Sequence, residues 1–395
     1  MIELDHNATT KPSPGVVSAM VHALTEDWHN PSSVHRAGQA ARRAVELARQ
    51  SLADLLGAKP REVVFTSGGT ESIHLALRGT LGALPPGRRT LITSPVEHSA
   101  VRDLAETLAA EGARVHWLRV DRAGRVDLNH LAELVRESGG LVSIQWSNNE
   151  TGAVQPVRDI ASICGKHGAI FHCDGTQWVG KEPTHVESEG FDLLTCSPHK
   201  FHGPKGVGVL WMRRGVRTRP QAPGTQELGR RGGTENVPGI VGAGVAASEA
   251  LAWLSDPSRR VRQRALRDLL ESLVRERCPE VVVNAPDAPT LPDGTPSRLW
   301  NTSNLAFPGL EAEALLMLLS ERGVTASAGA ACSSGSLEPS PVLLAMGLPE
   351  PVAHGSIRLS LGRETTEAQV REAAEILAQA VRTLRGSSGA ALPGA

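Results

Sequence analysis

Short apolar runs alternate with amphipathic stretches between about residues 34 and 201. Small and apolar residues recur at helical spacing from Ala37 to Leu55, and Gly57 follows them as a helix stop. A helix is also predicted over residues 70–77, and helical segments separate most of the predicted strands. This alternation predicts an α/β fold with a mostly parallel, doubly wound sheet that helices cover on both faces. The predicted strands are residues 62–66, 90–93, 114–120, 141–146, 169–173, 192–195 and 207–212.

The pattern changes after residue 212. Residues 213–233 are rich in turn formers, and a long helical stretch runs from Ile240 to about Arg277. Two further strands are predicted, over residues 281–283 and 356–360. We interpret the chain as a large domain of residues 16–255 and a smaller α/β domain of residues 1–15 and 256–385. The Gly-, Ser- and Ala-rich residues 386–395 are expected to form a flexible tail.

Charge and composition argue against several classes of partner. The 395 residues include 41 basic and 42 acidic side chains, and the net charge of −1 indicates neither a nucleic-acid groove nor an anionic membrane surface. The first six residues lack the basic and apolar regions of a signal peptide. The longest apolar stretch, residues 239–254, is interrupted by Ser248 and Glu249, which argues against a membrane span. We therefore expect a cytoplasmic protein with no nucleic-acid or membrane partner.

The cysteine pattern argues against structural cross-links. The five cysteines are odd in number and show no C-x-x-C spacing, so neither a disulfide framework nor a structural zinc site is indicated. A metal site built from His172, Cys173, Cys196 and His199 is conceivable. Because residues along a strand alternate between its two faces, His172 and Cys173 point in opposite directions, and we expect no metal there.

Polar residues follow several predicted strands. Ligands of parallel sheets bind beyond the carboxyl ends of the strands, so these residues are expected to lie together. The glycine-rich residues 66–71 (TSGGTE) open a helix whose free N–H groups favour a phosphate. They form neither a Walker loop nor a dinucleotide fingerprint. The other strand ends carry Glu97, His98, residues 147–152 (SNNETG), residues 174–177 (DGTQ) and residues 196–200 (CSPHK).

This set of residues matches the requirements of pyridoxal 5'-phosphate (PLP). PLP needs a lysine for its Schiff base, a carboxylate that keeps the pyridine nitrogen protonated, donors around the phosphate and a flat group against the ring. Each residue alone also has a structural explanation: Asp174 as a turn cap, His98 as a core histidine and Lys200 as a surface charge. Their convergence at the strand ends favours a PLP site with Lys200 as its lysine.

Motifs along essentially the whole chain resemble those of NifS-like cysteine desulfurases, which are class V, fold-type I PLP enzymes. Two positions differ from the residues that are common in the family: Pro198 stands where a small residue is usual, and His202 where an aromatic residue is usual. Neither change removes a catalytic group, although both bear on the turn that carries the lysine. The matching segments are residues 4–10 (LDHNATT), 30–35 (NPSSVH), 65–71 (FTSGGTE), 148–152 (NNETG), 197–200 (SPHK), 231–236 (RGGTEN), 331–340 (ACSSGSLEPS) and 357–363 (IRLSLGR).

The resemblance implies a homodimer and a set of roles around PLP. Lys200 would hold the cofactor and later move the Cα proton. His98 would stack on the ring and shuttle the proton of the substrate thiol. Arg358 would clamp the substrate carboxylate, with Asn149 also at the substrate. The other implied cofactor contacts are Gly69, Thr70, Ser197 and His199 at the phosphate, Thr234 of the neighbouring subunit at the same phosphate, Asp174 at the pyridine nitrogen, and Asn149 and Gln177 at the ring hydroxyl.

Cys332 is the position that narrows the reaction most. It lies among the small residues 326–336, which cannot build a core, and an exposed thiol on a mobile loop is a liability unless its reactivity is used. The implied reaction takes sulfur from L-cysteine, leaves L-alanine and forms a persulfide on Cys332. The remaining cysteines are expected to be buried or incidental, namely Cys164, Cys173, Cys196 and Cys278.

The sulfur acceptor and some rival activities stay open at this point. An iron–sulfur scaffold protein, a tRNA-thiolation relay and another carrier are all compatible, and the Cys332 persulfide is able to ligate an iron–sulfur cluster transiently. A selenocysteine lyase or an aminotransferase of the same fold is an alternative, although an aminotransferase needs no loop cysteine. A non-catalytic scaffold is another, against which the presence of Lys200, Asp174, His98 and Cys332 together argues.

Overall fold

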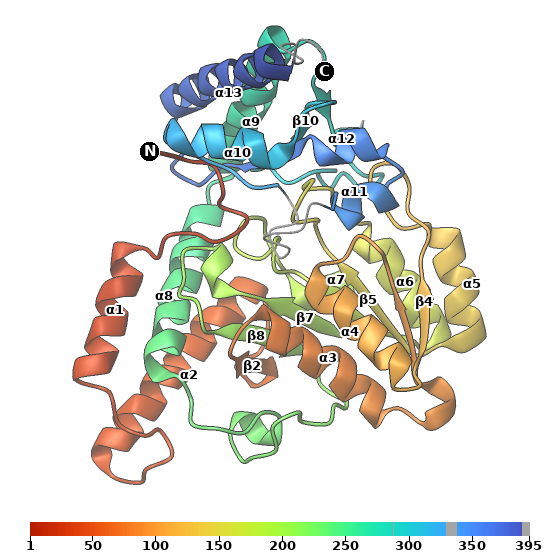
Figure 1. The fold of residues 1–395 in the computed structure, drawn as a ribbon. Coiled ribbons are helices and arrows are strands. Elements are labelled where there is room, and N and C mark those ends of the chain that lie inside the picture. The colour runs from red at the N-terminus through yellow and green to blue at the C-terminus, as the bar shows by residue number, and fades with distance from the viewer. Residues whose placement is uncertain (287, 329–337, 389–395) are drawn as a thin grey trace, which may run out of the picture.

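A seven-stranded sheet forms the centre of the computed structural model, which describes residues 1–286, 288–328 and 338–388 (Figure 1). The strand order is β2-β8-β7-β6-β5-β3-β4. Strand β8 runs antiparallel to β2 and β7, and the other neighbours are parallel, which confirms the mostly parallel α/β sheet. The strands are β2 (Val63–Thr66), β3 (Thr90–Thr93), β4 (Arg114–Trp117), β5 (Leu141–Gln145), β6 (Ile170–Asp174), β7 (Leu193–Cys196) and β8 (Gly208–Met212).

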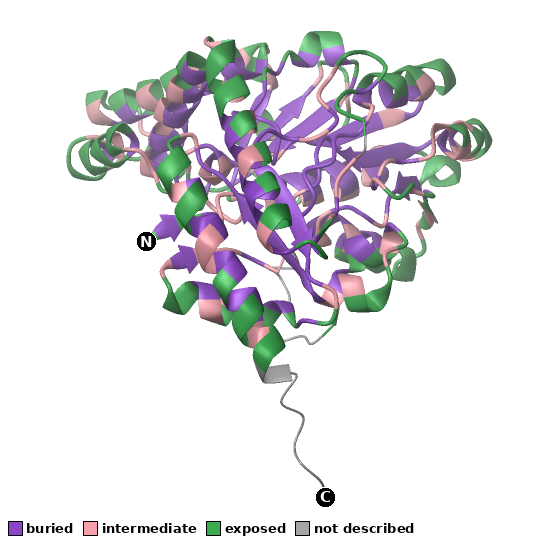
Figure 2. Ribbon diagram, turned by 90° about the horizontal axis from the view of Figure 1, so that it is seen from above, coloured by how far each residue is buried: buried purple, intermediate pink, exposed green. Residues whose placement is uncertain are grey.

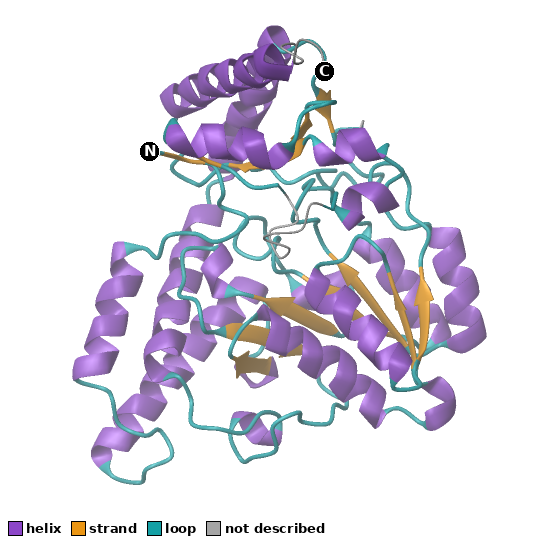
Figure 3. Ribbon diagram, viewed as in Figure 1, coloured by secondary structure: helices purple, strands orange, loops and turns teal. Residues whose placement is uncertain are grey.

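Helices cover both faces of this sheet (Figure 3). They are α1 (Pro14–Thr25), α2 (Arg36–Leu56), α3 (Gly69–Ala83), α4 (Ser99–Ala110), α5 (Leu128–Ser138), α6 (Val157–His167), α7 (Val186–Glu189) and α8 (Val237–Leu254). Short 3-10 turns are η1 (Pro60–Glu62), η2 (Pro86–Arg88), η3 (Pro198–Lys200) and η4 (Glu227–Gly229). Successive side chains of a strand point to opposite faces. In β2, Val64 therefore packs with α3 and α4, whereas Val63 and Phe65 pack in the cluster that contains α2 and α8.

The helix ends follow from local sequence signals. Gly57 ends α2 with φ of 62°, a left-handed conformation that glycine adopts without strain, and its N–H closes the last turn. The long helical stretch predicted up to Arg277 is divided into two helices, α8 and α9 (Pro257–Arg277). Asp256 caps the second helix by accepting from Ser258 N, and Pro257 loses nothing at the first helical position because its missing N–H would have no intrahelical partner.

A second group of elements lies beyond the carboxyl ends of the parallel strands (Figure 1). It contains an antiparallel sheet of order β12-β10-β9 and a parallel pair of β1 with β11. A separate apolar cluster that includes Leu270, Leu305 and Leu377 holds it together. The division into residues 16–255 against 1–15 with 256–385 stays a prediction. The elements are β1 (Ile2–Glu3), β9 (Val282–Val283), β10 (Thr302–Ala306), α10 (Ala312–Glu321), β11 (Val324–Thr325), α11 (Pro341–Ala345), α12 (Glu350–His354), β12 (Ser356–Ser360) and α13 (Glu367–Ser388).

The apolar pattern does not predict β10, because this strand is buried yet largely polar. Ser303 Oγ donates to Glu271 Oε1 at 2.8 Å, and Asn304 Oδ1 accepts from Asn284 Nδ2 at 2.7 Å. Buried polar groups are tolerated when they are paired in this way. Hydrogen bonding to distant residues thus replaces the apolar run that a sequence search looks for.

Helix α8 is long and apolar enough to cross a membrane by length and composition alone. In the structure, however, 61% of it is buried inside the protein. Figure 2 shows that buried residues lie mainly toward the centre of the molecule and exposed ones toward its rim. The helix packs along α1 and α2 (Figure 1). Small residues such as Gly244 allow this close approach, because a Cβ there would lie 2.6 Å from Ala48 Cα. Such burial is typical of a core helix.

Candidate active site

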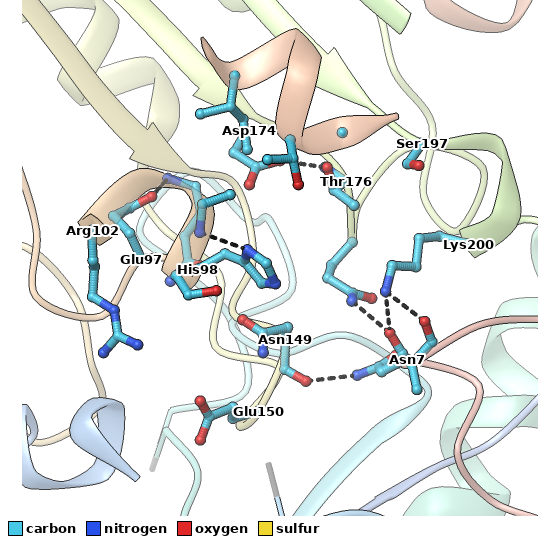
Figure 4. Close-up of a pocket in the computed structure, with 18 of the residues that line it drawn as sticks. Asn7, Glu97, His98, Arg102, Asn149, Glu150, Asp174, Thr176, Ser197 and Lys200 are labelled. Carbon is cyan, nitrogen blue, oxygen red and sulfur yellow. Dashed lines mark hydrogen bonds between the residues drawn. The ribbon is translucent and has the colours of Figure 1, made fainter. Parts of the chain in front are cut away.

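A cavity of about 620 Å³ opens at the carboxyl ends of the central strands (Figure 4). The N-terminal segment contributes Asn7 and Ala8 to its wall, and β12 contributes Arg358. Thr234 is exposed and does not line this cavity. Cys332 lies outside the described residues. The other sequence-predicted site residues all line it, namely Gly69, Thr70, His98, Asn149, Asp174, Gln177, Ser197, His199, Lys200 and Arg358.

Lys200 ends the η3 turn that follows β7, and its amine points into the cavity (Figure 4). Its Nζ donates to Asn7 O at 2.6 Å and to Ala8 O at 2.8 Å. The two residues that differ from the common family sequence both lie close to Lys200 in the chain. Pro198 occupies the first position of the turn, where no N–H is needed, and His202 takes φ of 69° just beyond it.

The start of α3 and the loop after β7 form an anion cradle. The first N–H groups of α3 have no intrahelical partner, and Ser197 approaches from the neighbouring loop. His199 lies beside them with Nδ1 3.1 Å from Thr9 Oγ1. Burial, and then the charges of Lys200, Lys205 and Lys181, lower the pKa of His199 to about 4, so its ring is neutral near pH 7.

Asp174 and His98 both line the cavity (Figure 4). Asp174 ends β6, is almost completely buried, and accepts from Thr176 N at 3.0 Å. His98 caps α4, and its Nδ1 accepts from Ala100 N at 3.1 Å. Because Nδ1 is an acceptor there, a neutral His98 carries its proton on Nε2.

Glu97 is a buried acid at the cavity wall, and the sequence pattern placed it at a strand end without predicting a role for it. It accepts from Ser94 Oγ at 2.6 Å and from Gln145 N at 2.8 Å. Burial and the nearby charge of Asp174 raise the pKa of Glu97 to about 8 despite these hydrogen bonds, so the folded protein keeps this acid protonated at neutral pH.

Arg358 is held at the cavity wall by two contacts. Its Nη2 donates to Asp5 Oδ1 at 2.6 Å and its Nη1 to Asn149 O at 3.0 Å, while Nε is buried and has no partner among the described residues. Arg363, the other arginine of the motif at residues 357–363, instead donates to Gly180 O at 2.6 Å and lies over the ring of Trp253. Of the two arginines, only Arg358 lines the cavity.

Several buried polar atoms around the cavity have no partner in the described part of the protein, which indicates that a polar ligand belongs there. Hydroxyl, amide and guanidinium groups are all represented, and with Lys200 and Asp174 they suit a flat, charged molecule that carries a phosphate. The residues present therefore fit PLP. The unpartnered atoms are Arg102 Nε, Ser147 Oγ, Asn149 Oδ1, Thr176 Oγ1 and Arg358 Nε.

In the structure, His172 of the metal site considered above takes part in hydrogen bonds between strands. His172 is fully buried and bonds Ser143 Oγ and Thr195 Oγ1, each at 2.9 Å, which ties three strands together. Burial lowers the pKa of His172 to about 4 and raises the pKa of the Cys173 thiol. Among the described residues no cluster of three or more His, Cys, Asp or Glu has the geometry to hold a metal ion. Cys164, Cys173, Cys196 and Cys278 are all buried, as expected.

The model of the aminotransferase class-V family matches residues 2–372, and the chain belongs to this family. A cysteine desulfurase of Nostoc sp. is 46% identical over 389 residues, which are 98% of this chain and 94% of the relative. A solved NifS-like protein superimposes with a TM-score of 0.88 at 36% identity, covering 97% of this chain and all of that one. A second, described as SspA in complex with cysteine, has a TM-score of 0.79 at 32% identity and covers 93% of this chain and 100% of that one. The resemblance to NifS-like cysteine desulfurases is confirmed.

Some cavity residues were missed by the sequence analysis. Arg102 and Thr176 line the wall, and Asn7 contacts Lys200 through its backbone oxygen. Arg102 lies on a helix face where an isolated arginine is usually a solvated charge, so no pattern singles it out. Asn7 lies within the motif of residues 4–10, but its role becomes visible only when the N-terminal segment is seen against the strand ends.

Proposed function

We propose that this chain is a PLP-dependent cysteine desulfurase, which takes sulfur from L-cysteine, leaves L-alanine and carries the sulfur as a persulfide on Cys332. The observation that supports this proposal is a single cavity lined by Lys200, Asp174 and several buried polar atoms that have no partner among the described residues. Enzymes of the class-V aminotransferase fold use PLP, and the chain's relatives include cysteine desulfurases and a neighbour solved with cysteine.

Bound PLP supplies an electron-accepting ring that makes the Cα proton of an amino acid removable. Lys200 anchors the cofactor and afterwards moves that proton with its Nζ. Asp174 pairs with the pyridine nitrogen, and His98 packs on the ring. Gly69, Thr70, Ser197 and His199 hold the phosphate, whereas Asn149 and Gln177 bind near the ring hydroxyl.

Arg358 orients the substrate through its carboxylate, with Asn149 beside it. His98 presents the Nε2 proton, so its ring is able to exchange protons with the substrate thiol near the cavity. The Cys332 thiolate then attacks the substrate sulfur, because a thiolate is a strong nucleophile. The sulfur–sulfur bond of the persulfide forms as the carbon–sulfur bond breaks, and the electron pair of that bond stays on the carbon fragment, which is protonated and released as alanine. The persulfide passes to an acceptor such as an iron–sulfur scaffold protein in the cytoplasm.

We further propose a homodimer in which Thr234 completes the phosphate site of the neighbouring subunit. The exposed position of Thr234 outside its own cavity supports this arrangement. Helix α1 also carries a stripe of Val17, Val21 and Leu24, each at least half exposed although large and apolar. An apolar helix face of this kind is typical of a surface that another subunit covers.

The test is a product assay on the purified protein loaded with PLP. Supplied with L-cysteine and a reductant, it should release alanine and sulfide in equal amounts, and Lys200→Ala should release neither. Selenocysteine and L-alanine plus a keto acid are assayed in parallel. Turnover of selenocysteine with none of cysteine, or amino-group transfer without sulfide, would assign one of the rival activities instead.

A further inference from the structure

Lys181 is a buried lysine behind the cavity wall that none of the proposed steps uses. Only 4% of its surface is exposed, and its Nζ donates to Asn7 Oδ1 at 2.7 Å and to Gln177 Oε1 at 2.6 Å. It follows Gln177 by four residues, directly after the loop that leaves β6. Both of its acceptors belong to residues that line the cavity.

The surroundings of Lys181 disfavour a charged amine. Burial, together with the charges of Lys200, Arg358 and Arg363, lowers the pKa of Lys181 well below its usual range. His6 and His199 are the titratable histidines nearby: burial lowers the pKa of each, and a charge on Lys181 would lower both further. A neutral amine has two N–H donors, and Asn7 and Gln177 provide an acceptor for each.

This contact fixes which way the amide of Gln177 faces. Its Oε1 is taken by Lys181, and its Nε2 donates one hydrogen to Asn7 O at 3.0 Å. The second N–H of Nε2 is then the polar group that Gln177 offers to the cavity. Asn7 O also accepts from Lys200 Nζ at 2.6 Å, so both lysines are joined through Asn7 and Gln177.

We propose that Lys181 is a positioning residue that holds the N–H side of the Gln177 amide toward the ring oxygen of bound PLP. This inference rests on the proposed function, which puts Gln177 at that oxygen. A donor there stabilises negative charge on the ring oxygen and weakens its hold on the neighbouring proton of the Lys200 nitrogen. Lys181 therefore lowers the pH at which the cofactor-bound protein loses this proton.

The experiment is a pH titration of the visible absorbance of the PLP-bound protein without substrate. Lys181→Met removes the donor that orients Gln177, so the amide is free to turn its oxygen toward the ring oxygen. We expect the absorbance midpoint to rise by about one pH unit, the size of one charge-assisted hydrogen bond. Lys166→Met, at an exposed lysine of α6, is the matched control and should keep the wild-type midpoint.

A second comparison separates positioning from a general change in the site. In a Gln177→Leu background there is no amide to orient, so adding Lys181→Met should move the midpoint no further. An additional shift in the double variant would overturn the proposal, because Lys181 would then act without Gln177. An unshifted midpoint in folded Lys181→Met, with PLP on Lys200 by borohydride mapping, would also overturn it while leaving the proposed function intact.

A milder substitution keeps the proposal testable if Lys181→Met does not fold. If circular dichroism shows that Lys181→Met is unfolded, Lys181→Gln is titrated, because its amide retains N–H donors. Its midpoint should stay within a few tenths of the wild-type value, and a shift as large as that of Gln177→Leu would contradict the inference. If the wild-type protein itself places no PLP on Lys200, the proposed function fails first.

Discussion

Arg358 donates to Asp5 Oδ1 at 2.6 Å, so the N-terminal segment holds this guanidinium at the wall of the cavity. The pair joins β12 to a residue more than 350 positions earlier in the chain. It leaves Nε of Arg358 buried, with no partner in the part of the chain that the structure describes. An arginine whose planar group is already fixed loses little freedom when it binds a second carboxylate.

Arg358→Lys should therefore weaken the use of cysteine without removing PLP. A lysine cannot hold Asp5, the Asn149 oxygen and a substrate carboxylate together, because it lacks the planar set of donors. We expect kcat/KM for cysteine to fall about 10- to 100-fold, mostly through KM, while the PLP absorbance persists.

Arg363→Lys is the matched control. Arg363 donates to Gly180 O and packs over Trp253 away from the cavity, so its variant should keep the wild-type KM. Steady-state kinetics on both variants shows which of the two arginines binds the substrate carboxylate. Equal damage from Arg363→Lys, with Arg358→Lys unaffected, would transfer the carboxylate role to Arg363.

Subunit mixing tests whether Thr234 serves the neighbouring subunit. Lys200→Ala and Thr234→Ala each impair every site of a homodimer. A mixed dimer, however, has one site with Lys200 from one subunit and Thr234 from the other, both unchanged. We expect mixing to restore activity above either parent, and sedimentation should show dimers. If Thr234 serves its own subunit, no site escapes both changes and mixing restores nothing.

Much of the fold follows from patterns that are local in the chain. The helical spacing from Ala37 to Leu55 and the stop at Gly57 match α2 and its left-handed cap. Strand β10 was not predicted from the local sequence pattern, because Ser303 and Asn304 are stabilised by partners on distant elements and not by an apolar run. Local rules predict elements that bury their own apolar side chains, and they fail where burial depends on long-range polar pairing.

The residues of the candidate site also divide into those that local sequence patterns predict and those that only tertiary packing brings together. Strand ends place Asp174, Gln177 and Lys200 together, because parallel strands finish at one edge of a sheet. The contacts of Asn7 with Lys200 and of Lys181 with Gln177 are absent from any strand-end pattern. They depend on how the N-terminal segment crosses that edge, which is decided by tertiary packing.

Glu97 should make stability depend on pH. Its pKa of about 8 lies above the usual value near 4.5, so between these values the folded state keeps a proton that the unfolded state releases. The free energy of unfolding should then fall with rising pH over this window, by about 1.4 kcal/mol per pH unit for a single group. Below pH 4.5 both states are protonated and the penalty is absent.

Glu97→Gln should remove this contribution, since an amide imitates the protonated acid without titrating. We expect the variant to match the wild type near pH 5 and to exceed its stability at pH 8, measured by urea unfolding of the PLP-loaded protein. Glu106→Gln, an exposed change on α4, is the control and should run parallel to the wild type. Parallel curves for Glu97→Gln as well would show that Glu97 is already ionised in the folded protein.

Cys332→Ser should separate the two halves of the proposed chemistry. Holding PLP, taking up cysteine and removing the Cα proton depend on Lys200 and Asp174, so the variant should bind PLP and change its spectrum when cysteine is added. Cleavage of the carbon–sulfur bond needs a thiolate, and the serine hydroxyl is essentially un-ionised at neutral pH. Alanine and sulfide should therefore fall to background.

Mass spectrometry after a single turnover locates the sulfur directly, and we expect one added sulfur atom on Cys332. The other thiols provide controls inside the same chain, because burial raises the pKa of Cys164 to about 12 and that of Cys196 well above its usual value. Neither is a useful nucleophile in the folded protein, so serine at these positions should leave turnover intact apart from any loss of folding. Sulfur on one of these cysteines, or alanine formed by Cys332→Ser at the wild-type rate, would mean that a different residue carries the sulfur or that the enzyme is a different lyase.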